Sequence, residues 1–77
     1  MKETVKEFIT EELLADESIT LHDEDQLLLD GMIDSLGMLR LVAFVETTFE
    51  IQIPYEDITV ENFNTVNSLT TYLASHQ

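Results

Sequence analysis

Apolar residues recur every three or four positions in three stretches of the chain, and this spacing predicts helices with one buried face. In residues 3–15 the apolar face consists of Val5, Phe8, Ile9 and Leu13. In a second helix, from Ser35 to Phe49 or Glu50, it consists of Met38, Leu41, Val42, Val45 and Phe49. In the last helix, capped by Asn64 or Thr65, it consists of Val66, Leu69, Tyr72 and Leu73.

A shorter helix is predicted at residues 59–63, where Thr59 is the capping residue and Val60 and Phe63 face the core. Pro54 lies between this helix and the second one, and it cannot continue a helix because it lacks the amide and clashes with the preceding turn. No sustained alternation predicts a strand, and no repeat is present. We therefore expect an all-α fold of one domain, residues 1–77, built as a four-helix bundle of three longer helices and one short helix.

Residues 16–34 show no sustained period and are rich in Asp and Glu, which predicts a long first loop. A short helical turn fits at residues 25–29. We expect the apolar side chains of the loop to hold it against the core; these are Ile19, Leu21, Leu27, Leu28, Met32 and Ile33. A loop of this length in a compact domain is usually either functional or a sign that an element has been misassigned.

The loop meets the second helix at the sequence Gly31-Met32-Ile33-Asp34-Ser35-Leu36. Gly31 permits a tight backbone path, and Asp34 is a strong candidate for the helix cap. Ser35 then lies exposed in the first turn, where free amides and the helix dipole favour an anion, although the charge of Asp34 opposes it. Asp-Ser before an apolar run is also an ordinary helix start. We interpret Ser35 as a serine that is modified and does not act as a nucleophile in catalysis by this chain.

The sequence resembles the acyl, peptidyl and D-alanyl carrier proteins, which carry substrates as thioesters on a 4'-phosphopantetheine arm. The resemblance is carried by Leu27-Leu28, Gly31, Ile33-Asp34-Ser35-Leu36, Phe49-Glu50-Ile51-Gln52-Ile53-Pro54, Thr65-Val66, Leu69 and Tyr72-Leu73. These pieces cover most of the chain, and their order and spacing are specific. The resemblance implies an acyl-carrier-protein-like fold and identifies Ser35 as the residue that bears the arm, with Asp34 and Leu36 beside it at the cofactor site.

The charge balance restricts the class of partner. The chain has 16 acidic residues against Lys2, Lys6 and Arg40, and its net charge of -13 argues against binding to nucleic acid or to an anionic membrane. Partners are expected to present basic patches. There is no cysteine, so neither a disulfide framework nor a cysteine-based metal site is expected. The first residues do not form a signal peptide, and we expect a cytoplasmic monomer.

The acidic residues of the loop raise the alternative of a calcium site. A loop counted from Asp23 has Leu27 at the fifth position, where an oxygen ligand belongs. A loop counted so that Gly31 is the turn glycine begins at Gln26 and places Leu28 third. Neither register makes an EF-hand, and no designed metal site is expected.

The second helix has apolar residues beyond its inward set, and Leu36, Leu39 and Ala43 fall on another side. Exposed apolar residues beside charged ones often mark a partner surface, whereas in the alternative interpretation neighbouring helices cover them. The resemblance favours the partner surface, and it implies that the contacts are made by Leu36, Leu39, Arg40, Ala43 and Glu46. Arg40 can pair with an acidic residue of the partner, with Glu46 or with a carboxylate of the loop.

One departure from the family narrows the expected function. Carriers of bacterial fatty acid synthesis typically have acidic residues along this helix, where the present chain has Gly37, Arg40 and Thr47-Thr48. This departure indicates a freestanding carrier of an acyl or aminoacyl group in a dedicated biosynthetic pathway. The implied partners are a phosphopantetheinyl transferase, an acyl- or aminoacyl-activating ligase, and downstream acyltransferases or condensing enzymes.

A catalytic role is not expected. A serine hydrolase needs a base oriented beside its serine, and the histidines are His22 in the acidic loop and His76 near the C-terminus. A domain this small does not also supply a substrate pocket and an oxyanion hole. The alternative function from another class is a small acidic helical interaction module, without a prosthetic group, that binds a basic partner through its second helix.

Overall fold

Helical segments joined by loops form the fold of residues 1–16 and 18–76, the part of the chain that the computed structural model describes. In chain order they are α1 (Lys2–Phe8), the π-helix η1 (Ile9–Leu13), α2 (Ser35–Phe49), the 3-10 helix η2 (Tyr55–Asp57), α3 (Val60–Phe63) and α4 (Val66–Ser75). No strand occurs within these described ranges. The predicted all-α bundle of four helices, one of them short, is confirmed.

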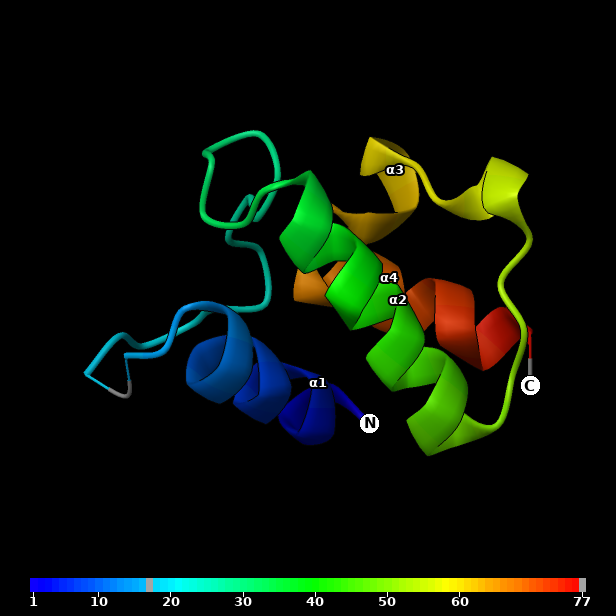
Figure 1. The fold of residues 1–77 in the computed structure, drawn as a ribbon, viewed down its shortest axis with the longest axis horizontal. Coiled ribbons are helices and arrows are strands. Elements are labelled where there is room, and N and C mark those ends of the chain that lie inside the picture. Colours follow the sequence, from blue (N-terminus) through cyan, green and yellow to red (C-terminus); the bar gives the residue numbers. More distant parts are fainter. Residues whose placement is uncertain (17, 77) are drawn as a thin grey trace.

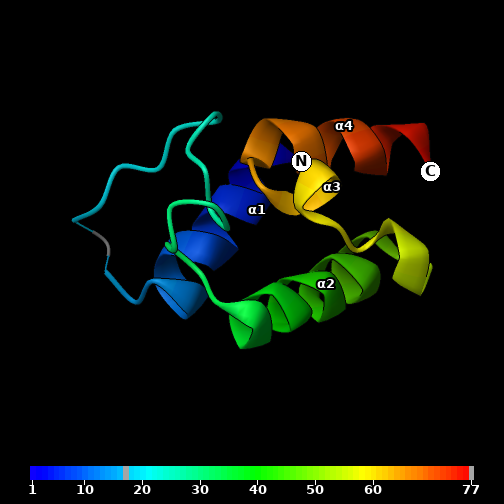
Figure 2. The ribbon, with the colours of Figure 1, turned by 90° about the horizontal axis from the view of Figure 1, so that it is seen from above.

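The helices enclose one apolar core. Helix α2 lies on one side of the molecule and α4 on the other (Figures 1 and 2), and both α1 and α3 pack against α4. The fully buried side chains are Val5, Ile9, Leu27, Leu41, Val45, Phe63, Val66, Leu69 and Leu73. Each large apolar side chain of this set contributes about 1.5–3 kcal/mol through burial. The core therefore receives residues from α1, η1, the first loop, α2, α3 and α4.

The helix predicted at residues 3–15 is present, but it begins one residue earlier and changes type. The amide of Leu14 donates a hydrogen bond to the carbonyl of Ile9 at 2.8 Å. This bond joins residues five apart, as in a π-helix. The widened turn leaves both Leu13 and Leu14 half-buried against the core. Ala15 then leaves the helical conformation with φ +53°. An apolar pattern does not signal a single π turn, because the same residues satisfy an α-helix.

The second and last helices follow the predicted boundaries. In α2, Leu41, Val42 and Val45 are buried, while Met38 and Phe49 are half-buried. The inward residues predicted for α4, namely Val66, Leu69, Tyr72 and Leu73, are all buried. Thr65 is the cap of α4: its Oγ1 accepts from the amide of Ser68 at 2.9 Å, and the Ser68 hydroxyl accepts from the amide of Thr65 at 3.2 Å. Of the two caps predicted for this helix, Asn64 and Thr65, the capping box identifies Thr65.

Two side chains predicted to face the core are exposed instead. Val60 is 45% exposed because α3 is a single turn, capped by Thr59 as predicted, and it buries only Phe63. Ile58, which precedes the cap, packs against the core. Ile19 is 38% exposed because the long loop reaches the core only from Leu21 onward. The predictions for Val60 and Ile19 were therefore wrong.

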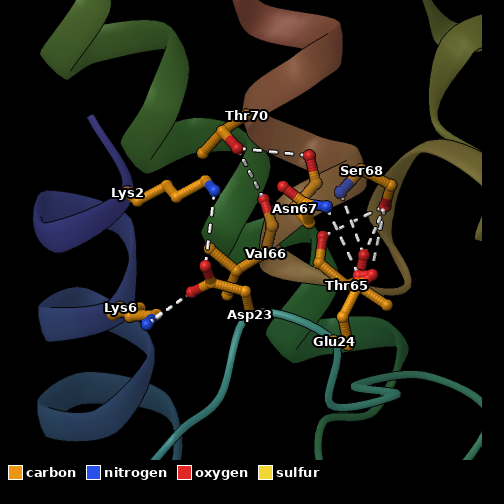
Figure 3. A network of polar contacts seen from close by, with 9 residues as sticks. All are labelled: Lys2, Lys6, Asp23, Glu24, Thr65, Val66, Asn67, Ser68 and Thr70. Carbon is orange, nitrogen blue, oxygen red and sulfur yellow. Dashed lines mark hydrogen bonds and ion pairs between the residues drawn. The ribbon is translucent and has the colours of Figure 1, made fainter.

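Asp23 connects the first loop to two helices. Its carboxylate pairs with Lys6 and, at 3.3 Å, with Lys2, both on α1 (Figure 3). Its carbonyl accepts from the amide of Asn67 on α4 at 3.0 Å. The hydrogen bond from Lys6, with a smaller contribution from Lys2, holds the pKa of Asp23 below its usual value. The loop is thus held against α1 and α4 ahead of the segment that leads to Ser35.

Aromatic side chains join the remaining elements. Phe8 and Phe44 stack with ring centroids 4.1 Å apart and join α1 to α2. The hydroxyl of Tyr72 donates to Asp57 Oδ2 at 2.6 Å and joins α4 to η2. Burial, together with this carboxylate, raises the pKa of Tyr72 to about 12. Among the described residues, no helix has the length and apolar character that crossing a bilayer requires.

Helix α2 ends at Glu50 in the left-handed conformation, with φ +54° and ψ +50°. A residue with a β-carbon is strained there by about 1–2 kcal/mol. We expect Glu50→Gly to raise the free energy of unfolding by about 0.5–1 kcal/mol, part of the relief being offset by the greater freedom of glycine in the unfolded chain. Urea unfolding followed by circular dichroism measures the change.

Glu50→Ala is the matched control. It removes the same carboxylate from the negative end of the helix dipole but keeps the backbone strain. Equal stabilities of the Gly and Ala variants would contradict the prediction, because the strain relieved at Glu50 would then be no larger than the entropic cost of glycine.

Candidate functional site

Ser35 is the first residue of α2, and its side chain is exposed. Asp34 precedes it in extended conformation, with φ -98° and ψ -174°, and Oδ1 of Asp34 accepts from the amide of Gly37 at 2.7 Å. The carbonyl of Asp34 accepts from the amide of Met38 at 2.9 Å. The predicted cap is confirmed, and it fixes the backbone on both sides of Ser35.

Gly37 allows this cap to close tightly. The residue is buried, and a β-carbon built there would lie 3.3 Å from Oδ1 of Asp34 and 3.3 Å from Cβ of Ile33. Both contacts are tighter than ordinary van der Waals packing, so the glycine accommodates the capping carboxylate and the end of the loop. Glycine within a helix costs about 1 kcal/mol relative to alanine. Here its lack of a side chain serves the geometry before Ser35.

The loop before the cap is held by Asn64, which lies between α3 and α4. Its carbonyl accepts from the amide of Leu27 at 2.6 Å, and its side-chain Oδ1 accepts from the amides of Leu28 at 3.1 Å and Leu29 at 3.0 Å. One asparagine therefore binds three successive backbone amides of a segment 35 or more residues away. From the sequence, Asn64 was expected only as a possible helix cap. No local pattern identifies such a contact, because it depends on the packing of the loop beside α4.

The segment between these anchors turns sharply and returns to the core. The amide of Asp30 donates to the carbonyl of Gln26 at 3.0 Å, which is the short turn expected near residues 25–29. Gly31 has φ +72°, a conformation that glycine adopts without strain. Ile33 is buried, and its amide donates to the carbonyl of Leu27 at 3.0 Å. The backbone thus arrives at Asp34 along a defined path.

The residues implied as partner contacts divide into two groups. Leu36 and Leu39 are 66% and 55% exposed, and Arg40 and Ala43 are also exposed. These four share the side of α2 that faces away from the core, so neighbouring helices do not cover them. Glu46 is half-buried instead, and its Oε2 accepts from the amide of Ile53 at 2.8 Å. Glu46 therefore holds the chain that follows α2.

The acidic residues of the loop have separate contacts. Besides the pairing of Asp23 with α1, Asp25 Oδ2 accepts from the amide of His22 at 2.9 Å, and Glu24 accepts from the side chain of Asn67 at 3.4 Å. Within residues 1–16 and 18–76, no three His, Asp or Glu side chains gather in a way that holds a metal ion.

Comparisons with known proteins find one family model and several carrier proteins that are similar to this chain. The model of a protein family described as "Phosphopantetheine attachment site" matches residues 3–73. The D-alanyl carrier protein of Streptococcus suis is 36% identical over 69 residues, which cover 90% of this chain and 85% of that protein. The D-alanyl carrier protein of Streptococcus sanguinis is 34% identical over 62 residues, which cover 79% of this chain and 76% of that protein. The D-alanyl carrier protein of Streptococcus uberis is 42% identical over 50 residues, which cover 64% of this chain and 61% of that protein.

The contacts of Asn64 lead to a testable prediction. Asn64→Ala leaves the amides of Leu28 and Leu29 without their acceptor, and we expect the free energy of unfolding to fall by about 1–3 kcal/mol. Amide hydrogen exchange should accelerate at Leu28 and Leu29. Exchange at Leu41 and Leu69 measures the loss of global stability. The matched control is Asn67→Ala, whose side chain makes one exposed hydrogen bond. If both variants unfold alike, the loop does not depend on Asn64.

Proposed function

The chain belongs to the phosphopantetheine attachment-site family of carrier proteins, whose members bear a covalent 4'-phosphopantetheine, and on this basis we propose that Ser35 is its attachment residue. Such carriers are not catalysts, so the chain is the substrate of enzymes that charge and discharge it. Ser35 is an exposed serine that opens an α-helix within the matched residues 3–73. The exposure of Ser35 at a fixed helix start is the single observation that carries the assignment.

The surroundings of Ser35 fit the phosphodiester of the arm. The Asp34 side chain takes the amide of Gly37, whereas the amides of Ser35 and Leu36 have no acceptor within the described residues. These two amides lie at the positive end of the α2 dipole, which favours an anion. The carboxylate of Asp34 repels that anion, and the free amides offset the repulsion. Asp34 and Leu36 therefore flank the arm, Asp34 by shaping the backbone and Leu36 by its exposed side chain.

Attachment of the arm uses a base from the transferase. The Ser35 hydroxyl attacks the phosphorus of coenzyme A that is nearer to the pantetheine, the bond to the adenosine bisphosphate breaks, and the hydroxyl proton passes to the transferase. When attached, the arm supplies a terminal thiol that carries the acyl group as a thioester. The chain itself has no cysteine that competes for the acyl group. Tethering gives the thioester a high effective concentration at each enzyme that docks on the carrier.

We propose that the cargo is a D-alanyl group. The similar proteins of Streptococcus suis and Streptococcus sanguinis are D-alanyl carrier proteins, and most of their length is matched. The α2 surface supports a dedicated carrier, since it lacks the acidic residues expected of a fatty acid carrier and presents Arg40. The partners are then a phosphopantetheinyl transferase, a ligase that activates D-alanine, and an acyltransferase that accepts the group. We expect this exchange to take place in the cytoplasm, where coenzyme A is available.

Intact mass spectrometry tests the attachment residue. After incubation with coenzyme A, magnesium and a broad-specificity phosphopantetheinyl transferase, the wild-type chain should gain the mass of one phosphopantetheine. Ser35→Ala should gain nothing and should melt like the wild type, because the side chain is exposed. Ser75→Ala is the matched control, because Ser75 is also exposed on a helix, and it should gain the arm as the wild type does. A chain that gains no arm beside an active control carrier would instead support an interaction module.

The cargo is tested on the holo chain with ATP and a D-alanine-activating ligase from the organism that makes this chain. With D-alanine we expect a further mass gain of one alanyl group. Hydroxylamine should remove this group, because hydroxylamine cleaves thioesters. L-alanine and a long-chain fatty acid with its own ligase serve as comparisons. Loading by the fatty acid ligase, with none from D-alanine, would replace the D-alanyl assignment by a fatty acyl one and leave the attachment residue unaffected.

A further inference from the structure

A groove lies between α1 and the C-terminal part of α2. Here the rings of Phe8 on α1 and Phe44 on α2 stack with their centroids 4.1 Å apart. Both side chains are only half-buried, so part of each ring remains in contact with water. Beside them is a hollow of about 390 Å³, lined by Thr4, Glu7, Phe8, Glu11, Glu12, Phe44 and Thr48. We call this hollow the α1–α2 groove and define it by these residues.

The wall of the groove that α1 and η1 form is acidic. It carries Glu7, Glu11 and Glu12, and all three side chains are exposed. Within the described residues, neither Glu7 nor Glu12 forms an ion pair. Glu7 and Glu11 lie four residues apart, a separation at which like charges destabilise a helix. A positive charge from outside the chain would offset this repulsion.

The chain's own cations do not occupy the groove. Its three Lys and Arg residues are Lys2, Lys6 and Arg40, and none of them lines this hollow. Lys2 and Lys6 are both paired with Asp23. Arg40 lines an adjoining hollow of about 440 Å³, which shares Phe8, Phe44 and Thr48 with the groove. The charge of Arg40 therefore limits how far a basic segment in the groove can extend toward the start of α2.

The groove is separate from the candidate site at Ser35. At about 1.5 Å per residue, Phe44 lies about 14 Å and Thr48 about 20 Å from Ser35 along the axis of α2. Ser35 does not line the groove. A partner bound in the groove therefore leaves the serine open to a second protein.

We infer that the α1–α2 groove binds a basic segment of a partner protein. An apolar side chain of that segment covers the exposed parts of Phe8 and Phe44, and Lys or Arg residues on either side of it meet Glu7 and Glu12. Charge complementarity selects this occupant, because the groove holds carboxylates and no cation. The inference goes beyond the proposed function, since it assigns a partner to a surface that attachment of the arm does not use.

A second copy of this chain does not supply such a segment. Lys2 and Lys6 are engaged with Asp23, and Arg40 is a single cation among uncharged neighbours on α2. Association would also bring together two chains that each carry a charge of -13. A different protein with a basic segment is therefore the occupant that the charges favour.

The blocked peptide acetyl-Lys-Lys-Leu-Leu-Lys-Lys-amide serves as the probe. It is titrated into the full nitrogen-15-labelled chain at moderate salt, which screens diffuse attraction between opposite charges. We expect saturable shifts of the amide resonances of Phe8, Glu12, Phe44 and Thr48. The same peptide with Ser in place of Leu, and spermidine, should bind at least fivefold more weakly. Equal binding of all three, or shifts without a maximum at the groove, would overturn the inference.

Thr48→Lys tests the site by placing an ammonium group in the groove. Thr48 is exposed near the C-terminal end of α2, where the helix dipole favours a positive charge. The variant should bind the probe at least fivefold more weakly than the wild type. Ser35→Ala cannot bear the arm and should bind the probe as the wild type does. A failure of the carrier function and a failure of this inference are therefore distinguishable.

Thr71→Lys is the matched control for Thr48→Lys. It makes the same change of charge at an exposed threonine of α4, which lies on the opposite side of the molecule from α2 (Figure 2). The control should bind the probe less than twofold more weakly than the wild type, and melting temperatures show that both variants are folded. Equal weakening in the two variants would reduce the effect to net charge and overturn the inference.

Photo-crosslinking in the cells that make this chain identifies the occupant. A photoreactive residue at position 48 should give a product that the same residue at position 71 does not give. Mass spectrometry of the cross-linked fragment should find Lys or Arg on both sides of an apolar residue. A product made of two copies of this chain, a fragment without these cations, or no product beyond that seen at position 71 would overturn the inference.

Discussion

Asn64 holds the first loop in the position from which α2 begins, and the candidate site depends on this contact. A segment of irregular backbone costs about 1–2 kcal/mol of conformational entropy per ordered residue, and residues 18–34 make few regular hydrogen bonds of their own. The loop is ordered by a series of contacts that begins with Asp23 on α1 and α4 and continues with three amides on Asn64. Buried Leu27 and Ile33 complete the series. The backbone then reaches Asp34 extended, caps α2 and exposes Ser35.

The overall charge of the chain differs in sign from the charge beside Ser35, so long-range attraction and short-range contact involve different surfaces. The chain carries -13 overall, yet the side of α2 that faces away from the core, with exposed Leu36, Leu39, Arg40 and Ala43, carries only the positive charge of Arg40. The acidic surplus attracts basic surfaces over about a Debye length. Beside Ser35, Leu36, Leu39 and Arg40 are exposed, and we propose that an enzyme that reaches the arm contacts them. A carrier that visits several enzymes benefits from this division, because each enzyme needs to match only a small surface to reach the arm.

Local chemistry made much of the fold predictable. The boundaries of α2 and α4 follow from apolar spacing, the caps Asp34, Thr59 and Thr65 follow from their side chains, and the exposure of Ser35 follows from its place after a cap. Contacts between distant segments were not predictable in this way. The role of Asn64 depends on a loop that packs beside it, and the carboxylate of Glu46 reaches Ile53 only because the chain turns back after Glu50. Val60 was misplaced because the apolar residues of a single-turn helix do not reveal which of them fills the core. Ile19 was misplaced because the apolar residues of a long loop do not reveal where the loop meets the core.

The central claim is that the fold presents one particular serine for attachment of the arm. Fragmentation mass spectrometry of the chain purified from the cells that make it tests this directly, without an added transferase or a substituted residue. We expect to find the phosphopantetheine on the peptide containing Ser35, with fragment ions that place it on that side chain. Its presence on any other serine or threonine, or a chain that is never modified in those cells, would contradict the account.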